Sequence, residues 1–314
     1  GLSPSRTSNY NTRQNGYDIS ADALGYPESY YTPPSQAIEQ IQFIKGAGSL
    51  QFGPQFGGLI NFKLKNGNKY RLISGNFQKS FGSFGVSSTY LDFGGMNKRF
   101  RYFAFFNHKT GNEWRPNSAF EVITGGVNLT YYIREDKVLN AEFTKMNYLA
   151  QQPGGLTDLE FRTAPFTSKR ERNWFAIDWN LWSINYKHTF NSKNILNTKV
   201  FGLFASRKAL GFLGQINRAD PLTERNLIVG EFNNIGLESK LLKIYDIKEL
   251  PQALLIGVRL YNGNSIGQQG FGTASSNPDF YFIDQSEHEF SDYRFPSYNC
   301  LLYTSDAADE GHCV

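Results

Sequence analysis

The sequence predicts a mostly β protein, the larger part of which is an antiparallel β-barrel wall that crosses a membrane. Three observations support this fold class. Apolar and polar residues alternate in many segments beyond residue 69, the links between these segments alternate between short and long, and aromatic residues reach 16% of the chain. The 27 Phe, 18 Tyr and 30 Gly suit strands with interfacial aromatic residues better than helices.

The bulk composition of the 314 residues resembles that of a soluble protein, with 40% hydrophobic residues and a mean hydropathy of −0.45. No run of about 18 apolar residues occurs, which excludes a transmembrane helix. Membrane strands escape such averages because only one face of each strand is apolar. The formal net charge of +4 does not by itself indicate a partner.

Both ends of the sequence are unusual. The chain does not begin with Met and no signal peptide precedes Gly1, so we expect the N-terminal part to be missing. Residues 300–314 resemble the translation of a sequencing-library adapter, with a genuine polar tail as the alternative. Both cysteines, Cys300 and Cys313, lie in this segment, so we expect neither disulfides nor thiol chemistry.

The first segment, residues 1–66, is rich in Ser, Asn, Tyr, Pro and Gly. Residues 37–45 predict a short helical turn that continues into a strand. Residues 46–58 form a glycine-punctuated turn region, and residues 59–65 alternate as a second strand.

Residues 67–299 predict about ten strands, close to the roughly 9–11 residues that a tilted strand needs to cross a bilayer. Clear alternation occurs at 100–107, 127–133, 139–144, 182–187 and 254–261. Short links near 94–98, 134–137, 191–194 and 245–252 alternate with long links near 110–120, 150–177, 207–232 and 263–293. Outer-membrane barrels have tight turns on one side and long loops on the other. Because a spanning sheet must close on itself, ten strands are expected to be only part of a barrel.

A family signature lies between residues 39 and 62. Glu39-Gln40-Ile41-Gln42-Phe43-Ile44-Lys45 is followed by a small-residue turn with Phe52-Gly53, and then by Gly57-Gly58-Leu59-Ile60-Asn61. This string resembles the end of the plug domain in TonB-dependent outer-membrane receptors. Residues 1–6, 15–19 and 52–55 look like the plug of the ferric citrate transporter type. The resemblance implies that residues 1–66 are the C-terminal part of an α/β plug domain in the lumen of a barrel of about 22 strands.

The same resemblance implies active import across the outer membrane of a Gram-negative bacterium. The expected ligand is a ferric chelate, either a siderophore or a ferric citrate-like complex, and an oligosaccharide or other nutrient is the alternative. The expected partners are the TonB energy-transducing complex, whose contact segment is absent from this sequence, the iron chelate and outer-membrane lipid. A passive porin lacks a plug, and a soluble β adhesion protein has no reason to alternate short and long links, so both fit less well.

No enzyme, cofactor, metal site or nucleic-acid partner is expected. The chain has no G-x-S-x-G motif and no phosphate loop, and its Ser, His and Asp residues are too scattered for a triad. Glu287-His288-Glu289 cannot all face one ion if they are adjacent in an extended loop.

Ligand binding is expected where the plug apex faces the long loops. Arginine suits an anionic chelate and tyrosine offers a rigid surface with a polar tip. The candidates in the plug are Arg6, Arg13, Gln14, Tyr17, Tyr26, Tyr30 and Tyr31. For Arg6 and Arg13 the alternative is an ion pair with barrel carboxylates that only fastens the plug to the wall. Glu28 stands where ferric citrate transporters carry glutamines, and it would repel an anion.

Four further candidates lie at borders between strands and long loops: Trp114, Arg115, Gln151 and Gln152. Their alternative role is loop packing or, for the tryptophan, a place in an aromatic girdle.

Overall fold

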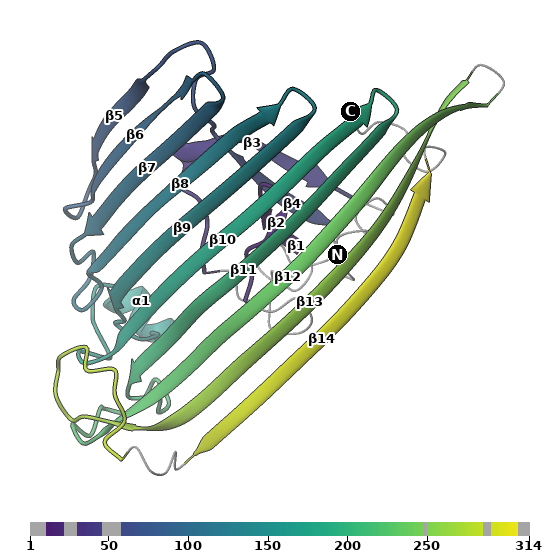
Figure 1. Ribbon diagram of the computed structural model, residues 1–314. Coiled ribbons are helices and arrows are strands. Elements are labelled where there is room, and N and C mark those ends of the chain that lie inside the picture. The colour runs from purple at the N-terminus through teal and green to yellow at the C-terminus, as the bar shows by residue number, and fades with distance from the viewer. Residues whose placement is uncertain (1–10, 22–29, 46–57, 248–249, 285–289, 307–314) are drawn as a thin grey trace.

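A computed structural model describes residues 11–21, 30–45, 58–247, 250–284 and 290–306. These residues form a four-stranded sheet with the order β2-β1-β4-β3 and a ten-stranded sheet that follows chain order from β5 to β14. The large sheet is strongly curved, and the small sheet lies on its concave side (Figure 1). The predicted partial antiparallel barrel of about ten strands is therefore confirmed.

Every strand of the large sheet pairs antiparallel with the next, from β5–β6 through β13–β14. The strands are β5 (Ser74–Phe81), β6 (Ser87–Asn97), β7 (Phe100–Gly111), β8 (Phe120–Arg134), β9 (Lys137–Gln151), β10 (Trp174–Asn191), β11 (Asn194–Gly211), β12 (Arg225–Ile247), β13 (Leu250–Gly272) and β14 (Ser291–Asp306). Strand β14 thus extends into the adapter-like segment.

The links between strands differ in length at the two ends of the sheet. At one end lie the turns 98–99, 135–136 and 192–193, and β12 and β13 are only two residues apart there; at the other end lie the loops 112–119, 152–173 and 212–224 and the link 273–290, of which 273–284 and 290 are described. The predicted strict alternation is wrong at the first hairpin, because residues 82–86 make a tight turn at the loop end. Phe84 and Gly85 have φ of 56° and 65°, and the Gly82 N–H donates to the Val86 carbonyl at 2.8 Å, which closes this hairpin.

The two faces of the large sheet have different chemistry. On β10, Ile184 on the convex face is 48% exposed, whereas the neighbouring Ser183 on the concave face is 1% exposed. Ile256 on β13 is likewise exposed, and Asn128 and Glu142 are buried. The concave face thus carries polar groups beside the apolar side chains that meet the small sheet, and an apolar outer face with polar groups inside is the pattern of a membrane barrel wall.

The small sheet is built from β1 (Asn11–Gln14), β2 (Tyr17–Asp18), β3 (Ile38–Ile44) and β4 (Leu59–Leu64). Strand β4 runs parallel to β1 and antiparallel to β3. The predicted helical turn before β3 is a single 3-10 turn at Ser35–Ala37, and β3 and β4 lie where strands were expected.

The main apolar core lies between the two sheets. Tyr17, Ile19 and Tyr31 of the N-terminal part pack with Trp179 and Leu181, among others, of the large sheet. The described part of the chain has no helix that is long and apolar enough to span a membrane.

Candidate functional site

The tip of the β1–β2 hairpin is inserted into the polar concave face of the large sheet. Asn15 and Gly16 form this tip with φ of 46° and 81°. The Asn15 side-chain amide donates to Glu142 Oε2 at 2.6 Å, and Lys199 Nζ donates to the Asn15 carbonyl. Ser183 Oγ donates to Glu142 Oε1 at 3.1 Å. Strands β9 and β11 therefore hold one turn of the plug, and Ser183 on β10 holds the β9 carboxylate in place.

A cluster of charged side chains lies beside this turn. Arg13 Nε is 3.1 Å from Asp18 Oδ1, and Arg13 Nη1 is 3.1 Å from Glu238 Oε2 on β12. Arg259 on β13 is paired with Asp18, and Lys240 Nζ is 2.5 Å from Glu238 Oε1. Arg13 is fully buried, and its ion pair with Glu238 joins the plug to the barrel wall. An ion pair with a barrel carboxylate is the alternative role given above for this residue.

Gln14, Tyr17 and Tyr31 form a buried hydrogen-bonded chain. The Tyr31 hydroxyl donates to Gln14 Oε1 at 2.8 Å, and Gln14 Nε2 lies 3.0 Å from the Tyr17 hydroxyl and 3.2 Å from Thr144 Oγ1 on β9. Burial, and then the nearby Glu142 carboxylate, raise the pKa of both tyrosines. Both hydroxyls therefore stay protonated, and all three side chains hold the plug against the wall.

Tyr30 lies at the edge of this interface, where it is only partly buried. Its ring centroid is 5.7 Å from that of Phe175 and 5.9 Å from that of Trp179, and Tyr148 is 6.2 Å from Phe175. The guanidinium of Arg207 lies 5.8 Å from the Phe175 ring centroid. Sequence reasoning missed Tyr148, Phe175 and Arg207, although their alternation next to the long links places them on one face near the loop end.

Among the loop-border candidates, Arg115 joins two neighbouring loops, and the contacts of the others lie beside or within a single loop. Arg115 donates to the Gly154 carbonyl and, at 3.4 Å, to the Thr167 carbonyl, and its guanidinium lies 5.1 Å from the Trp114 ring centroid. The Ala119 N–H donates to Gln151 Oε1 at 3.3 Å. The Gln152 N–H donates to the Asn173 carbonyl at 2.9 Å.

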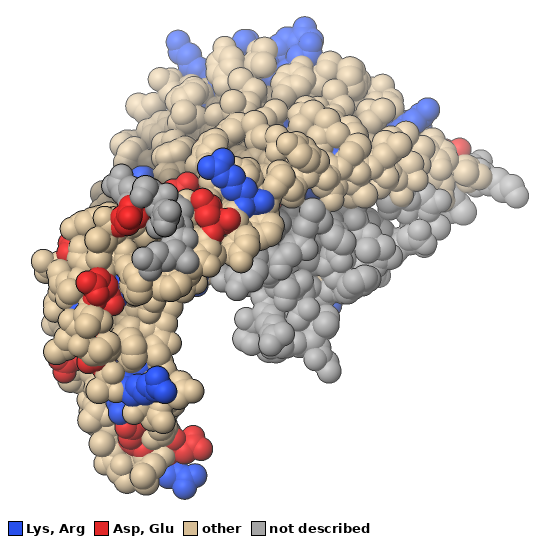
Figure 2. All heavy atoms as spheres, turned by 90° about the horizontal axis from the view of Figure 1, so that it is seen from below, with Lys and Arg blue, Asp and Glu red and all other residues tan. Residues whose placement is uncertain are grey.

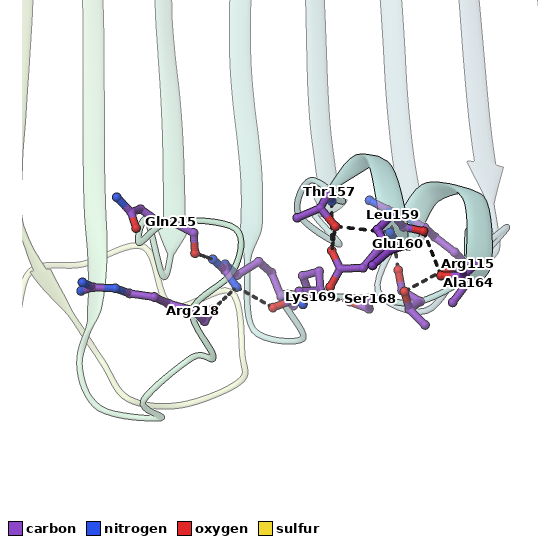
Figure 3. A network of polar contacts seen from close by, with 12 residues as sticks. Arg115, Thr157, Leu159, Glu160, Ala164, Ser168, Lys169, Gln215 and Arg218 are labelled. Carbon is purple, nitrogen blue, oxygen red and sulfur yellow. Dashed lines mark hydrogen bonds and ion pairs between the residues drawn. The ribbon is translucent and has the colours of Figure 1, made fainter.

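Arg170 joins loop 152–173 to loop 212–224. Its guanidinium donates to the carbonyls of Gly214 and Gln215 at 2.9 Å and of Arg218 at 3.0 Å, and it lies 4.7 Å from the Phe212 ring centroid. In Figure 3, dashed lines join Gln215 and Arg218 of loop 212–224 to the segment beside Lys169. Because the side chain is 4% exposed, its charge is balanced by main-chain acceptors rather than by water.

Two further arginines extend the connection to loop 273–290. Arg172 makes a bidentate pair with Asp220 at 2.9 and 2.5 Å, and it donates to the Ala274 carbonyl at 2.6 Å. Burial is the largest single effect on Asp220 and opposes its ionisation, but the hydrogen bonds from Arg172 and from the Leu222 N–H, together with the charges of Arg172 and Arg170, lower the pKa of this carboxyl. Arg225 donates to the carbonyls of Arg172 and Asn277 at 2.9 and 2.8 Å. The long loops are thus linked in chain order by Arg115, Arg170, Arg172 and Arg225, of which the last three are buried.

Helix α1 (Asp158–Thr163) belongs to loop 152–173 and begins with a capping box between Thr157 and Glu160. Lys169 Nζ lies 2.5 Å from Glu160 Oε1 and ties the helix to the end of its loop. The helix lies behind the strands in Figure 1 and in front of them in Figure 3, where the strand order is reversed. It is therefore on the concave side, at the loop end of the lumen.

Seen from the loop end, basic and acidic side chains are interspersed over the rim of the curved sheet (Figure 2). No group of three or more His, Cys, Asp or Glu residues that could hold a metal ion is found within the described ranges. The candidates Arg6 and Tyr26, as well as Glu28 and Glu287-His288-Glu289, lie outside those ranges.

These features define a class of structure: a barrel wall with part of a plug domain fastened to its inner face. Several solved outer-membrane proteins share it. The ferric citrate transporter FecA superposes with a TM-score of 0.82 at 20% identity, over 98% of this chain and 46% of the transporter. The ferripyoverdine receptor of Pseudomonas aeruginosa gives 0.71 at 13% identity, over 94% and 42%, respectively. BauA, the ferric preacinetobactin receptor of Acinetobacter baumannii, gives 0.67 at 10% identity, over 94% and 46%.

The fold of this chain is that of the TonB-dependent outer-membrane receptors, as the resemblance at residues 39–62 implied. No protein-family model matches the sequence. The chain spans less than half the length of each of these three solved proteins.

Proposed function

We propose that this chain is part of a TonB-dependent active transporter that imports a ferric chelate across the outer membrane of a Gram-negative bacterium. The observation that carries the proposal is the docked β1–β2 hairpin. A wall that holds a plug turn through Glu142, Ser183 and Lys199 is obstructed rather than open, which favours gated transport over passive diffusion.

The ligand class rests on the similar structures, several of which are ferric citrate or siderophore receptors. Among the sequence-derived candidates, Tyr30 fits direct ligand contact best, because it is only partly buried and adjoins Tyr148 and Phe175. Arg13, Gln14, Tyr17 and Tyr31 support the site by fixing the plug, and Trp114, Arg115, Gln151 and Gln152 support it by fixing the loops.

The test is uptake of radioactive iron, supplied as a ferric chelate, by iron-starved cells that carry the complete gene. The expected result is uptake that stops when the inner membrane is de-energised and that falls severalfold in the Tyr30→Ala variant. Uptake that persists without an energised inner membrane would contradict active transport. A Phe84→Ala variant, altered in the short hairpin at residues 82–86, serves as the matched control and should transport normally.

A further inference from the structure

The short turns at one end of the large sheet carry an excess of cations. The turn rim is defined as residues 97–100, 133–137, 190–194 and 243–247, which lie at the upper ends of the strands in Figure 1. Its cations are Lys98, Arg99, Arg134, Lys137, Lys193 and Lys243, and its carboxylates are only Glu135, Asp136 and Asp246. A surface with such an excess of one charge attracts a partner of the opposite charge.

Half of these cations are available to a partner. Arg134 and Lys193 are paired with carboxylates at 3.3 and 2.5 Å, and Arg99 donates to a main-chain carbonyl at 3.1 Å. The side chains that form no ion pair or hydrogen bond within the described ranges are those of Lys98, Lys137 and Lys243. Lys98 and Lys243 are exposed, and Lys137 is partly exposed. These three ammonium groups can therefore meet an anion from outside the protein.

Main-chain hydrogen bonds between the turns and the neighbouring strands fix the rim. The carbonyls of Arg99, Asp136 and Lys193, one in each turn, accept the N–H groups of Tyr132, Thr189 and Ile244 at 2.7 to 2.8 Å. Each of these N–H groups belongs to the next strand along the sheet, so every turn is tied to the hairpin beside it. The cations are thus held in a row before any partner binds.

This row borders the convex side of the wall. Alternation places Lys137 and Lys243 on the convex face, two positions from the apolar and exposed Leu139 and Leu241. Large exposed aromatic rings lie beside the cations, namely those of Phe100, Tyr131 and Phe190. Aromatic rings and lysines with long apolar stems are typical of the border between hydrocarbon and lipid headgroups. The position of the rim therefore favours a lipid over a soluble anion.

The opposite border of the convex face does not have this excess of cations. Lys145 lies 3.3 Å from Asp178, and His108 lies 2.7 Å from Glu121. Positive charge is thus concentrated at the turn end of the sheet, which faces the periplasmic leaflet in an outer-membrane barrel.

We infer that the turn rim is a binding surface for anionic glycerophospholipids of the periplasmic leaflet. The lipid phosphates meet Lys98, Lys137 and Lys243, and the acyl chains lie along the apolar convex face. This inference goes beyond the proposed function, because it requires a membrane-embedded wall but no transport.

The experiment titrates the detergent-solubilised complete gene product with phosphatidylglycerol, and separately with phosphatidylethanolamine of the same chain length. Native mass spectrometry measures both affinities. Phosphatidylglycerol should bind at least tenfold more tightly. Lys137→Gln and Lys243→Gln should each weaken its binding about fivefold, the effect expected of one cation at an anionic lipid surface, and should leave phosphatidylethanolamine binding unchanged. Raising the salt concentration should reduce the preference.

Lys208→Gln is the matched control, because Lys208 lies on the convex face near the loop end. It should keep the full preference for phosphatidylglycerol. Equal affinity for the two lipids would overturn the inference, and is the result expected if a soluble anionic partner covers the rim. An equal loss in Lys208→Gln would also overturn it, because any surface cation would then serve. The titration contains no iron chelate, so failure of iron uptake would remove only the proposed function.

Discussion

Gly16 is the residue that lets the β1–β2 turn enter the wall. Its φ of 81° lies in the left-handed region, and a Cβ there would stand 3.3 Å from Lys199 Nζ. We expect Gly16→Ala to destabilise plug docking by about 1 kcal/mol, because it combines backbone strain with crowding of this lysine. Faster protease cleavage of the plug would report the effect. Gly267→Ala is the control, since a Cβ at Gly267 meets no atom within 4 Å.

Glu238 links the plug to β12 through Arg13 and is also paired with Lys240. Glu238→Ala leaves buried Arg13 and partly buried Lys240 without this carboxylate, and the loss of one partner from a buried pair costs roughly 3–5 kcal/mol. The expected result is a lower thermal midpoint of the detergent-solubilised protein and a more protease-sensitive plug. An unchanged midpoint would show that the plug is held mainly by its apolar contacts with Trp179 and Leu181.

At the scale of single elements, α1 provides a pH-dependent contact. The hydrogen bond from Lys169, followed by those from the N–H and hydroxyl of Thr157, lowers the pKa of Glu160 from 4.5 to about 2. Because the pKa is lower in the folded state, the contribution of this pair to loop stability is complete above about pH 4.5 and is lost as the pH falls towards 2. A spin label at Thr163 should therefore become more mobile over this range. Glu160→Gln should remove the pH dependence, and mobility that changes equally in both proteins would contradict the assignment.

The strands could be predicted because alternation with period two is a local property, visible for example in Ile184 next to Ser183. The loops could not be predicted in the same way. Arg170 and Arg225 bind main-chain carbonyls of other loops, and any residue can offer a carbonyl, so no sequence pattern identifies the acceptor. Arg13 illustrates the same limit, because only the folded chain brings it to Glu238, 225 positions away.

The residues proposed for the candidate site could be named from the sequence, but their division between buried and exposed positions could not. The tyrosines of residues 17–31 were visible in the sequence, yet their division into buried Tyr17 and Tyr31 and partly exposed Tyr30 depends on the facing wall.

At the scale of the whole molecule, the curved sheet separates the lipid on its convex side from the plugged lumen on its concave side. Neighbouring residues of one strand can be used to probe the two sides. Cysteine substituted for Ile184 should react with a lipid-soluble maleimide in native membranes, because this side chain projects from the convex face. Cysteine substituted for Ser183 should be protected, because its side chain is buried at the plug, 3.1 Å from Glu142. Weakening the plug with Gly16→Ala should expose Ser183→Cys to a water-soluble reagent and leave Ile184→Cys unchanged. If both positions reacted alike with either reagent, the sheet would not divide lipid from a plugged lumen.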